Sequence, residues 1–249
     1  MLIRLDGEVA VITGAANGIG RGVALGMADA GARVALLDRS ESGLGAVREL
    51  IEPTGAGVST YCVDVRDATA VAQAVNHVSD TLGDPTVLVT AAAVDGSASV
   101  IDLSVDDWKK MLDINLNGTF YSLKAVLPAM RRQGRGRVIF FGSNIGLKGG
   151  SEIAHYGASK AAVHGLTRCA AIDLAPFNIT VNAVAPGPVD TDMLQSLPAA
   201  WLEAKHQEML TGRFGTVADI VPTVILLASD SGAFYTGATL NLSGGDVLQ

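Results

Sequence analysis

Seven short runs of apolar, largely β-branched residues recur along this 249-residue chain, and stretches of helical periodicity separate them. The runs occupy residues 8–13, 33–37, 59–63, 86–90, 137–141, 180–185 and 238–242, and the helical stretches lie near 19–30, 41–51, 68–82, 105–132, 155–175 and 217–228. This alternation is typical of repeated βαβ units and a parallel sheet. Because the runs are almost wholly apolar, helices are expected on both faces of the sheet. The pattern predicts an α/β fold with a doubly wound parallel sheet of about seven strands.

No linker, repeat or low-complexity run divides the chain, so residues 1–249 are predicted to form a single domain. Segment 188–213 is less regular, because Pro188, Pro198 and Trp201 interrupt an apolar, weakly helical stretch. It forms either a mobile lid over the substrate or an additional pair of packed helices. We favour the lid because the segment follows the carboxyl end of a strand, where ligands bind in open α/β sheets.

Composition restricts the partners of the chain. Apolar residues make up 49% and charged residues 17%, which is unusually apolar for a soluble protein and predicts buried subunit interfaces in a homo-oligomer. The net charge of −7 does not favour a nucleic-acid partner. The one dense basic run, Arg131, Arg132, Arg135 and Arg137, is interpreted as a solvated helix end and turn.

Neither a membrane nor a metal site is expected. No apolar run approaches the ~18 residues that a membrane helix needs, and the first strand begins too early for a signal peptide. The histidines lack metal-ligand spacing, and Cys62 and Cys169 are expected to be small core residues. We therefore predict a cytoplasmic protein.

The first strand continues into Gly14-Ala15-Ala16-Asn17-Gly18-Ile19-Gly20 and then into a helix. Gly14 permits a tight exit from the strand, Gly18 lets a pyrophosphate approach the backbone, and Gly20 allows close packing of helix on sheet. A pyrophosphate there would face the free N–H groups of a helix N-terminus. The strand before the turn and the helix after it support a Rossmann-like dinucleotide site.

The second strand leads to Asp38, at about the 20-residue offset of a ribose-binding acid. A carboxylate there accepts hydrogen bonds from the 2′-hydroxyl and repels a 2′-phosphate, which favours NAD(H) over NADP(H), although Arg39 could soften the repulsion. Asp38 could instead be a turn or N-cap residue. Asp64, after the third strand, is placed to bind the adenine amino group or to serve as a plain turn residue.

Tyr156 and Lys160 are four residues apart, which places them on one face of a helix. Ser143 lies at the carboxyl end of the fifth strand, the sheet edge where ligands bind. Hydride transfer to a ketone leaves an alkoxide that must be protonated. Tyrosine, with an ordinary pKa near ~10, needs a nearby ammonium such as Lys160 to lower that pKa. Ser143 can hold the substrate oxygen against Tyr156.

Taken together, these motifs make the sequence resemble the short-chain dehydrogenases/reductases of the compact, one-domain type, over essentially the whole chain. The motifs are the glycine turn, Asn115, Ser143, Tyr156-Gly157-Ala158-Ser159-Lys160, Asn182-x-x-x-Pro186-Gly187 and Gly244-Gly245. The resemblance implies that Asn115 completes a catalytic tetrad, with a kinked helix that helps hold a water linking Lys160 to solvent. It also implies that Thr191 contacts the nicotinamide carboxamide beside Val189, and that the protein is a homotetramer.

The predicted site therefore has three parts. The catalytic residues are Asn115, Ser143, Tyr156 and Lys160. The cofactor-binding residues are Gly14, Asn17, Gly18, Ile19, Gly20, Asp38, Asp64, Val65, Ala92, Tyr156, Lys160, Val189 and Thr191. The substrate-binding residues are Ser143, Ile145, His155 and Tyr156, with His155 also open to a purely structural interpretation.

One stretch departs from the family pattern. Thr90-Ala91-Ala92-Ala93 stands where the family usually has Asn-Asn-Ala-Gly, so the side-chain amides that support the fourth strand are missing. Ala93 replaces a glycine near the cofactor ribose. The departure bears on cofactor affinity and leaves the proton chemistry untouched.

The main functional prediction is hydride transfer between NAD(H) and a secondary alcohol or ketone, with a small polyol, sugar-derived or cyclic substrate favoured by Asp95 and Lys148. An alternative is a 3-oxoacyl-thioester reductase acting on acyl-carrier-protein or CoA substrates, a class that normally uses NADPH. Asp38 opposes it, as do Gly134 and Phe177, which stand where carrier-dependent relatives tend to have basic residues. A third alternative is a non-catalytic NAD(H)-binding protein, which the intact tetrad disfavours.

Overall fold

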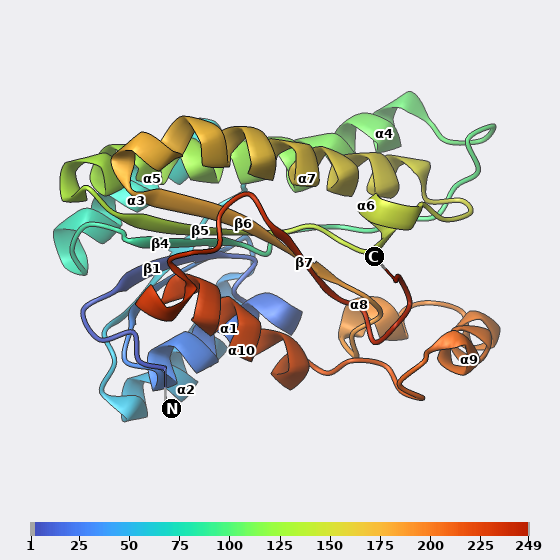
Figure 1. Cartoon of the computed structure of the whole chain (residues 1–249), viewed down its shortest axis with the longest axis horizontal. Coiled ribbons are helices and arrows are strands. Elements are labelled where there is room, and N and C mark those ends of the chain that lie inside the picture. Colours follow the sequence, from blue (N-terminus) through green and yellow to red (C-terminus); the bar gives the residue numbers. More distant parts are fainter. Residues whose placement is uncertain (1–2, 249) are drawn as a thin grey trace.

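The computed structural model describes residues 3–248 and contains one parallel sheet (Figure 1). Its seven strands follow the order β3-β2-β1-β4-β5-β6-β7. They are β1 (Val9–Thr13), β2 (Arg33–Asp38), β3 (Val58–Cys62), β4 (Val87–Thr90), β5 (Gly136–Phe141), β6 (Ile179–Pro186) and β7 (Thr239–Leu242). The strand order reverses between β1 and β4, so the crevice at their carboxyl ends is the expected ligand position. The predicted doubly wound α/β fold is confirmed.

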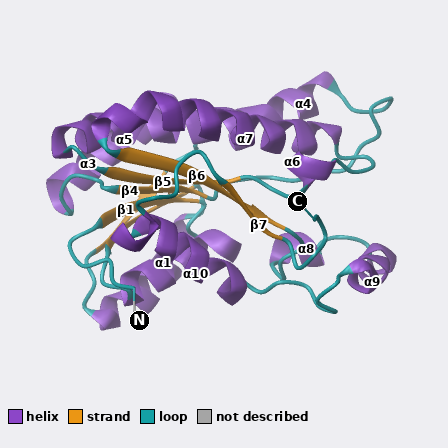
Figure 2. Cartoon of the chain, in the orientation of Figure 1, coloured by secondary structure: helices purple, strands orange, loops and turns teal. Residues whose placement is uncertain are grey.

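Helices cover both faces of the sheet (Figure 2). One layer comprises α1 (Gly18–Asp29), α2 (Glu41–Ile51) and α10 (Val217–Ala228). The opposite layer comprises α3 (Ala68–Thr81), α4 (Val105–Leu112), α5 (Gly118–Gln133) and α7 (Ala154–Leu174). Three short helices lie near the carboxyl edge: α6 (Ile145–Lys148), α8 (Asp192–Gln195) and α9 (Ala199–Glu208).

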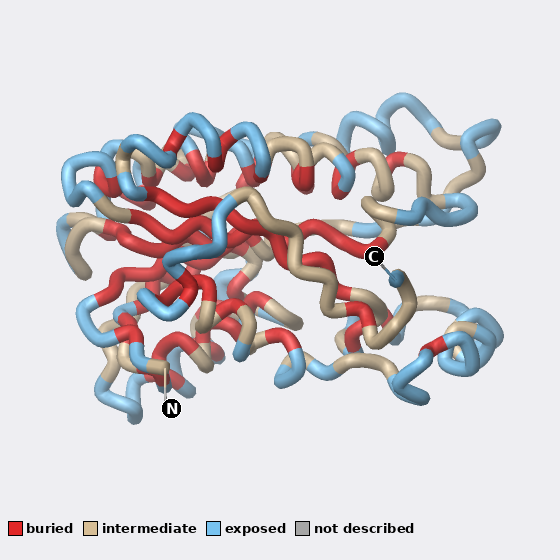
Figure 3. The backbone as a smooth tube through the Cα atoms, in the orientation of Figure 1, coloured by how far each residue is buried: buried red, intermediate tan, exposed pale blue. Residues whose placement is uncertain are grey.

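The two layers explain why the strands are apolar throughout. Successive strand residues point to opposite faces, so Ala10 and Ile12 join the core under α1 and α10, whereas Val9 and Val11 join the core under α3 and α5. The buried strands form the centre of the molecule in Figure 3. A polar residue on either face would lose its hydration, which explains why the strand sequences are almost wholly apolar.

The helical stretch predicted at 105–132 is interrupted. A π-helical turn at Asp113–Asn117 separates α4 from α5 and contains the buried Asn115. π-turns of this kind occur frequently at functional sites. The interruption agrees with the kinked helix that the family resemblance implies.

Segment 188–213 contains α8 and α9, joined and flanked by irregular backbone. Helix α9 buries none of its residues, and Trp201 remains 44% exposed. Figure 1 shows this segment projecting beside the carboxyl edge of the sheet. Its action as a lid stays a prediction.

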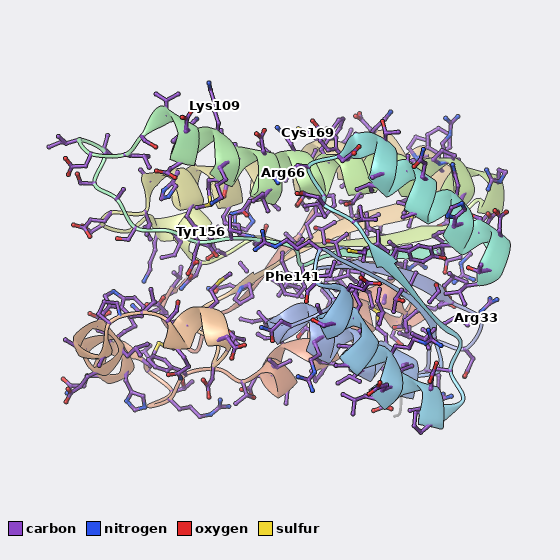
Figure 4. All side chains as sticks on the ribbon, turned by 180° about the vertical axis from the view of Figure 1, so that it is seen from behind. Arg33, Arg66, Lys109, Phe141, Tyr156 and Cys169 are labelled. Atoms are coloured by element: carbon purple, nitrogen blue, oxygen red, sulfur yellow. The ribbon has the colours of Figure 1, made fainter. Side chains whose placement is uncertain are left out.

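Two further observations concern the surface. The prediction that Cys62 and Cys169 are core residues is wrong: both are free thiols at exposed positions, and Cys169 lies on the outer side of α7 (Figure 4). An apolar sequence context does not decide which side of a helix a residue occupies. Within residues 3–248, no helix is long and apolar enough to cross a membrane, and no cluster of side chains suits a metal ion.

Candidate active site

The glycine turn after β1 has the geometry that a dinucleotide requires. Gly14 and Gly18 have positive φ angles of 68° and 52°, a region that side chains disfavour. A Cβ on Gly14 would lie 2.6 Å from the backbone nitrogen of Ala92, and one on Gly20 would lie 2.1 Å from the carbonyl oxygen of Gly14. Asn17 caps α1 by accepting a hydrogen bond from the Gly18 N–H.

A cavity of about 400 Å³ extends from this turn along the carboxyl edge of the sheet. It collects twelve of the predicted cofactor residues: Gly14, Asn17, Gly18, Ile19, Gly20, Asp38, Asp64, Val65, Ala92, Tyr156, Lys160 and Thr191. Val189 lies outside its lining, buried beside Gly215. A side chain at Gly18 would fill the space between the turn and Thr191. These residues fit a pyridine dinucleotide, whose pyrophosphate the glycine turn would hold.

Helix α7 brings Tyr156 and Lys160 to the opposite wall of the cavity. The Lys160 Nζ lies 5.7 Å from the centre of the Tyr156 ring and donates a hydrogen bond of 2.9 Å to the carbonyl oxygen of Phe141. Figure 4 shows Tyr156 and Phe141 near this edge. The end of β5 therefore anchors the lysine next to the tyrosine.

Burial dominates the titration of this pair. It raises the pKa of Tyr156, against the lowering effect of the Ser143 hydroxyl and with a smaller raising effect of Asp95. Burial also lowers the pKa of Lys160 to about 8. The shift is therefore opposite in direction to the lowering that we expected from Lys160, because desolvation of the phenol dominates.

Ser143 is buried directly after β5, and its hydroxyl is held by its own turn. Its Oγ accepts a hydrogen bond from the Ile145 N–H at 3.1 Å and donates to Asn144 Oδ1 at 3.2 Å. Ser143 and Ile145 do not line the dinucleotide cavity itself. Gly142, the residue before Ser143, does line that cavity.

The Asn115 side chain forms hydrogen bonds with the backbone that follows β4. Its Oδ1 accepts from the Val94 N–H and its Nδ2 donates to the Val94 carbonyl, both at 2.9 Å. Nδ2 also lies 3.2 Å from Ser159 Oγ on α7. The π-turn thus positions one amide that joins the strand end to the helix carrying Tyr156. The stretch that departs from the family pattern begins nearby at Thr90, whose buried Oγ1 has no hydrogen-bond partner.

His164 belongs to the site although we did not predict it. Its Nε2 lies 3.0 Å from the Ser143 carbonyl oxygen and its Nδ1 lies 3.3 Å from Thr239 Oγ1. Burial lowers the pKa of His164, so the ring is neutral at pH 7. A neutral ring has one donor, and a carbonyl can only accept, so Nε2–H donates to Ser143. Its place four residues after Lys160 was the available sequence signal.

A second cavity of about 400 Å³ adjoins the first and shares Ala93, Val94 and Met193 with it. His155 lines it, although the side chain is only 3% exposed and its buried Nδ1 has no hydrogen-bond partner. Asp95, Ser97, Asp107 and Lys110 supply the other polar groups of the wall. The structure therefore places His155 outside the first cavity and in the wall of the second.

The comparisons with known proteins agree with this geometry. A family model described as "Enoyl-(Acyl carrier protein) reductase", from the short-chain dehydrogenase/reductase family, matches residues 14–246. The chain belongs to the short-chain dehydrogenase/reductase family. It is accordingly an NAD(P)-dependent oxidoreductase acting on CH–OH groups.

Named relatives cover nearly the whole length of the chain. The 3-oxoacyl-(acyl-carrier-protein) reductase FabG of Pseudomonas aeruginosa is 37% identical over 97% of this chain and 98% of the relative. The enzyme of that name from Thermotoga maritima is 35% identical over 99% of this chain and 100% of the relative. A short-chain type dehydrogenase/reductase from Mycobacterium marinum is 30% identical, with a TM-score of 0.95 over 100% of this chain and 98% of that chain.

The relatives overturn the expected preference for NAD(H) over NADP(H). The relatives from Pseudomonas aeruginosa and Thermotoga maritima are named as 3-oxoacyl-(acyl-carrier-protein) reductases, a class that normally uses NADPH. The structure supplies a physical reason. The two Asp38 carboxylate oxygens accept hydrogen bonds from the backbone N–H groups of Ala16, at 3.2 Å, and Ser40, at 3.0 Å. Arg39 and Arg66 line the same cavity.

Asp64 is also less available than the sequence indicated. Arg66 donates three hydrogen bonds to its carboxylate, and this pairing lowers the pKa of Asp64. Arg66, which is labelled in Figure 4, lines the cavity together with Asp64. Arg39, which we expected beside Asp38, is thus joined in the cavity wall by a second arginine, Arg66, that we did not predict there.

Proposed function

We propose that the protein reduces the 3-oxo group of a 3-oxoacyl thioester with NADPH, giving the 3-hydroxyacyl thioester. The observation that carries this proposal is the set of 3-oxoacyl-(acyl-carrier-protein) reductases aligned with at least 96% of the chain. Tyr156 and Lys160 in the cavity wall support it, together with the Ser143 hydroxyl that hydrogen-bonds to Tyr156. The comparisons favour this alternative over the small polyol or sugar-derived substrate that we preferred from the sequence.

The residues divide the chemistry among themselves. The dinucleotide would lie along the glycine turn and supply a hydride to carbon 3 of the substrate. The Ser143 hydroxyl donates a hydrogen bond to the substrate carbonyl oxygen and orients it. Tyr156 Oη transfers its proton to the same oxygen as the alkoxide forms. Its raised pKa keeps that proton in place until the oxygen becomes basic, and the Lys160 ammonium stabilises the phenolate that remains.

The second cavity is proposed to receive the part of the acyl group beyond carbon 3. An unpartnered polar atom in a buried position costs about 1–3 kcal/mol, and His155 Nδ1 is such an atom. A hydroxyl or carbonyl oxygen on the acyl chain would supply the missing hydrogen bond. We therefore expect His155→Phe to raise KM for a polar acyl chain more than KM for acetoacetyl thioester.

The thioester carrier is proposed to be an acyl carrier protein. Phe177 stands where carrier-dependent relatives tend to have a basic residue, but the Arg131 guanidinium lies 4.5 Å from its ring centre and restores a cation there. We propose further that the protein is cytoplasmic and forms a homotetramer. The exposed Phe120 on α5 and Ile172 on α7 support buried subunit contacts.

The deciding experiment follows the loss of absorbance at 340 nm with acetoacetyl-CoA and with acetoacetyl-acyl carrier protein, using NADPH and NADH in parallel. We expect turnover with NADPH and a lower KM for the carrier-linked substrate. Arg131→Ala should raise only the carrier-linked KM, whereas Arg132→Ala is the matched control, since Arg132 pairs with Asp84 instead. Turnover of small ketones without turnover of either thioester would refute the proposal.

A further inference from the structure

The carboxylate of Asp246, in the turn after β7, contacts side chains from three separate segments of the chain. Its side chain is only 4% exposed. It accepts hydrogen bonds from Asn144 Nδ2, Lys148 Nζ at 2.6 Å and Lys205 Nζ. Asn144 follows Ser143, Lys148 ends α6, and Lys205 belongs to α9. In Figure 1 the C-terminal segment accordingly passes between α6 and the region of α8 and α9.

The turn that carries Asp246 is itself fixed. The Asp246 N–H donates to the Ser243 carbonyl at 3.1 Å, and Asn241 Nδ2 donates to the Val247 carbonyl at 2.7 Å. Gly187 packs so closely on this turn that a Cβ would lie 2.8 Å from the Ser243 backbone. Asp246 is therefore held at a defined place relative to the sheet.

On one side, Asp246 determines how Asn144 faces Ser143. The Asn144 amide directs its Nδ2 to the carboxylate, so its Oδ1 is left facing the Ser143 hydroxyl at 3.2 Å. The Ile145 N–H, at 3.1 Å, holds the same hydroxyl from the other side. The direction of the Ser143 O–H bond thus depends on Asp246 through one intervening side chain.

On the other side, Asp246 holds α9. The Lys205 side chain is 11% exposed although its helix buries no residue, and its second partner, Glu208, is 64% exposed. Burial alone would lower the pKa of Lys205, but its hydrogen bonds with Asp246 and Glu208 raise it. Burial opposes ionisation of Asp246, but the two lysines lower its pKa. Both groups are charged at neutral pH, and the contact is an ion pair largely shielded from solvent.

We propose that Asp246 is a positioning residue that couples the placement of α9 to the orientation of the Ser143 hydroxyl. Movement of α9 withdraws Lys205 from the shared carboxylate, which changes the contacts of Asn144 and therefore the direction in which Ser143 donates. The inference rests on the proposed function only in assigning Ser143 to the substrate carbonyl. It predicts that residues in α9, remote from the tetrad, act on the rate of the chemical step and not only on substrate affinity.

A double-mutant cycle tests the coupling. Asp246→Asn and Lys205→Met are each expected to lower kcat for acetoacetyl-thioester reduction by about tenfold, with the Kd for NADPH unchanged. The double variant should be no slower than Asp246→Asn alone, because the carboxylate transmits both effects. Additive losses, an unchanged kcat in either single variant, or an effect confined to KM would overturn the proposal.

A matched control and a second readout separate this proposal from the proposed function. Glu208→Gln removes a carboxylate from the exposed end of the same ion chain and should leave kcat unchanged. Amide hydrogen exchange without substrate should speed up across 199–208 and at Ile145 in Asp246→Asn, but not in Glu208→Gln. Unaltered exchange overturns the coupling. Altered exchange in a protein that reduces no thioester refutes the proposed function and leaves the coupling supported.

Discussion

At the scale of single residues, burial changes the chemistry of the active site more than neighbouring charges do. Lys160 is buried and Tyr156 is partly buried in the cavity wall, so desolvation raises the pKa of the phenol and lowers that of the ammonium to about 8. Lys160 remains close to Tyr156 while its ammonium donates a hydrogen bond to the Phe141 carbonyl oxygen. The pair is consequently set up to donate a proton from tyrosine, as ketone reduction requires.

Replacing Tyr156 by Phe should remove the proton donor without disturbing the dinucleotide cavity. We expect kcat to fall by about three orders of magnitude or more, while NADPH binding changes little. Stopped-flow turnover and fluorescence titration would measure the two effects. Tyr61→Phe, which loses only a surface hydrogen bond to Thr81, is the matched control. Retention of a tenth of the wild-type rate would exclude Tyr156 as the proton donor.

The lowered pKa of Lys160 predicts a pH dependence with a definite sign. The ammonium is present below pH about 8 and is lost as the pH rises through that value. Ketone reduction should therefore be constant below this range and decline above it, because the protonated pair is the active form. The pH profile of kcat/KM between pH 6 and pH 10, a range chosen to bracket that pKa, tests this. A flat profile would contradict the assignment.

At the scale of elements, the site depends on one irregular turn of helix. The π-turn Asp113–Asn117 places Asn115 so that its amide satisfies both backbone groups of Val94 and reaches Ser159. An uninterrupted α-helix would rotate the residues after the insertion by about 100° relative to those before it. The element therefore links the end of β4 to α7.

Asn115→Ala should leave the Val94 N–H and carbonyl without partners. Each unsatisfied buried group costs about 1–3 kcal/mol, so we expect a loss of roughly 2–5 kcal/mol in the free energy of unfolding, together with reduced turnover. Urea denaturation measures the first effect. Asn117→Ala, which removes a hydrogen bond to Asp113 in the same turn, should cost less than about 1 kcal/mol. Equal losses of stability in the two variants would argue against a stabilising role for the hydrogen bonds between Asn115 and Val94.

At the scale of the whole molecule, several large apolar side chains are exposed on different elements of the surface. Phe120 is 43% exposed on α5, Ile172 is 76% exposed on α7, and Phe234 before β7 is fully exposed. With apolar residues at 49% of the sequence, these positions are expected to lie in subunit contacts.

Light scattering at micromolar concentration should give a mass four times the 25.5 kDa of one chain. Ile172→Glu, which places a charge in an expected contact, should shift the mass toward smaller species without unfolding the subunit. Ser42→Glu on α2 introduces the same side chain at an exposed helix position in the opposite layer and serves as the control. A monomeric wild-type protein would refute the tetramer.

The sequence alone determined the features that local physics controls. Strands and helices followed from hydrophobic periodicity, the dinucleotide turn from the positive φ angles that only glycine readily adopts, and the pairing of Tyr156 with Lys160 from helical spacing. Only the tertiary structure decided that two backbone N–H groups donate hydrogen bonds to the Asp38 carboxylate and that Cys62 and Cys169 face solvent. It also decided that burial shifts the pKa values of Tyr156 and Lys160 in opposite directions. It also brought Asp246 to Asn144, about a hundred residues away in the chain. These properties depend on which distant groups exclude water from a side chain or satisfy its hydrogen bonds, and no local pattern specifies that packing.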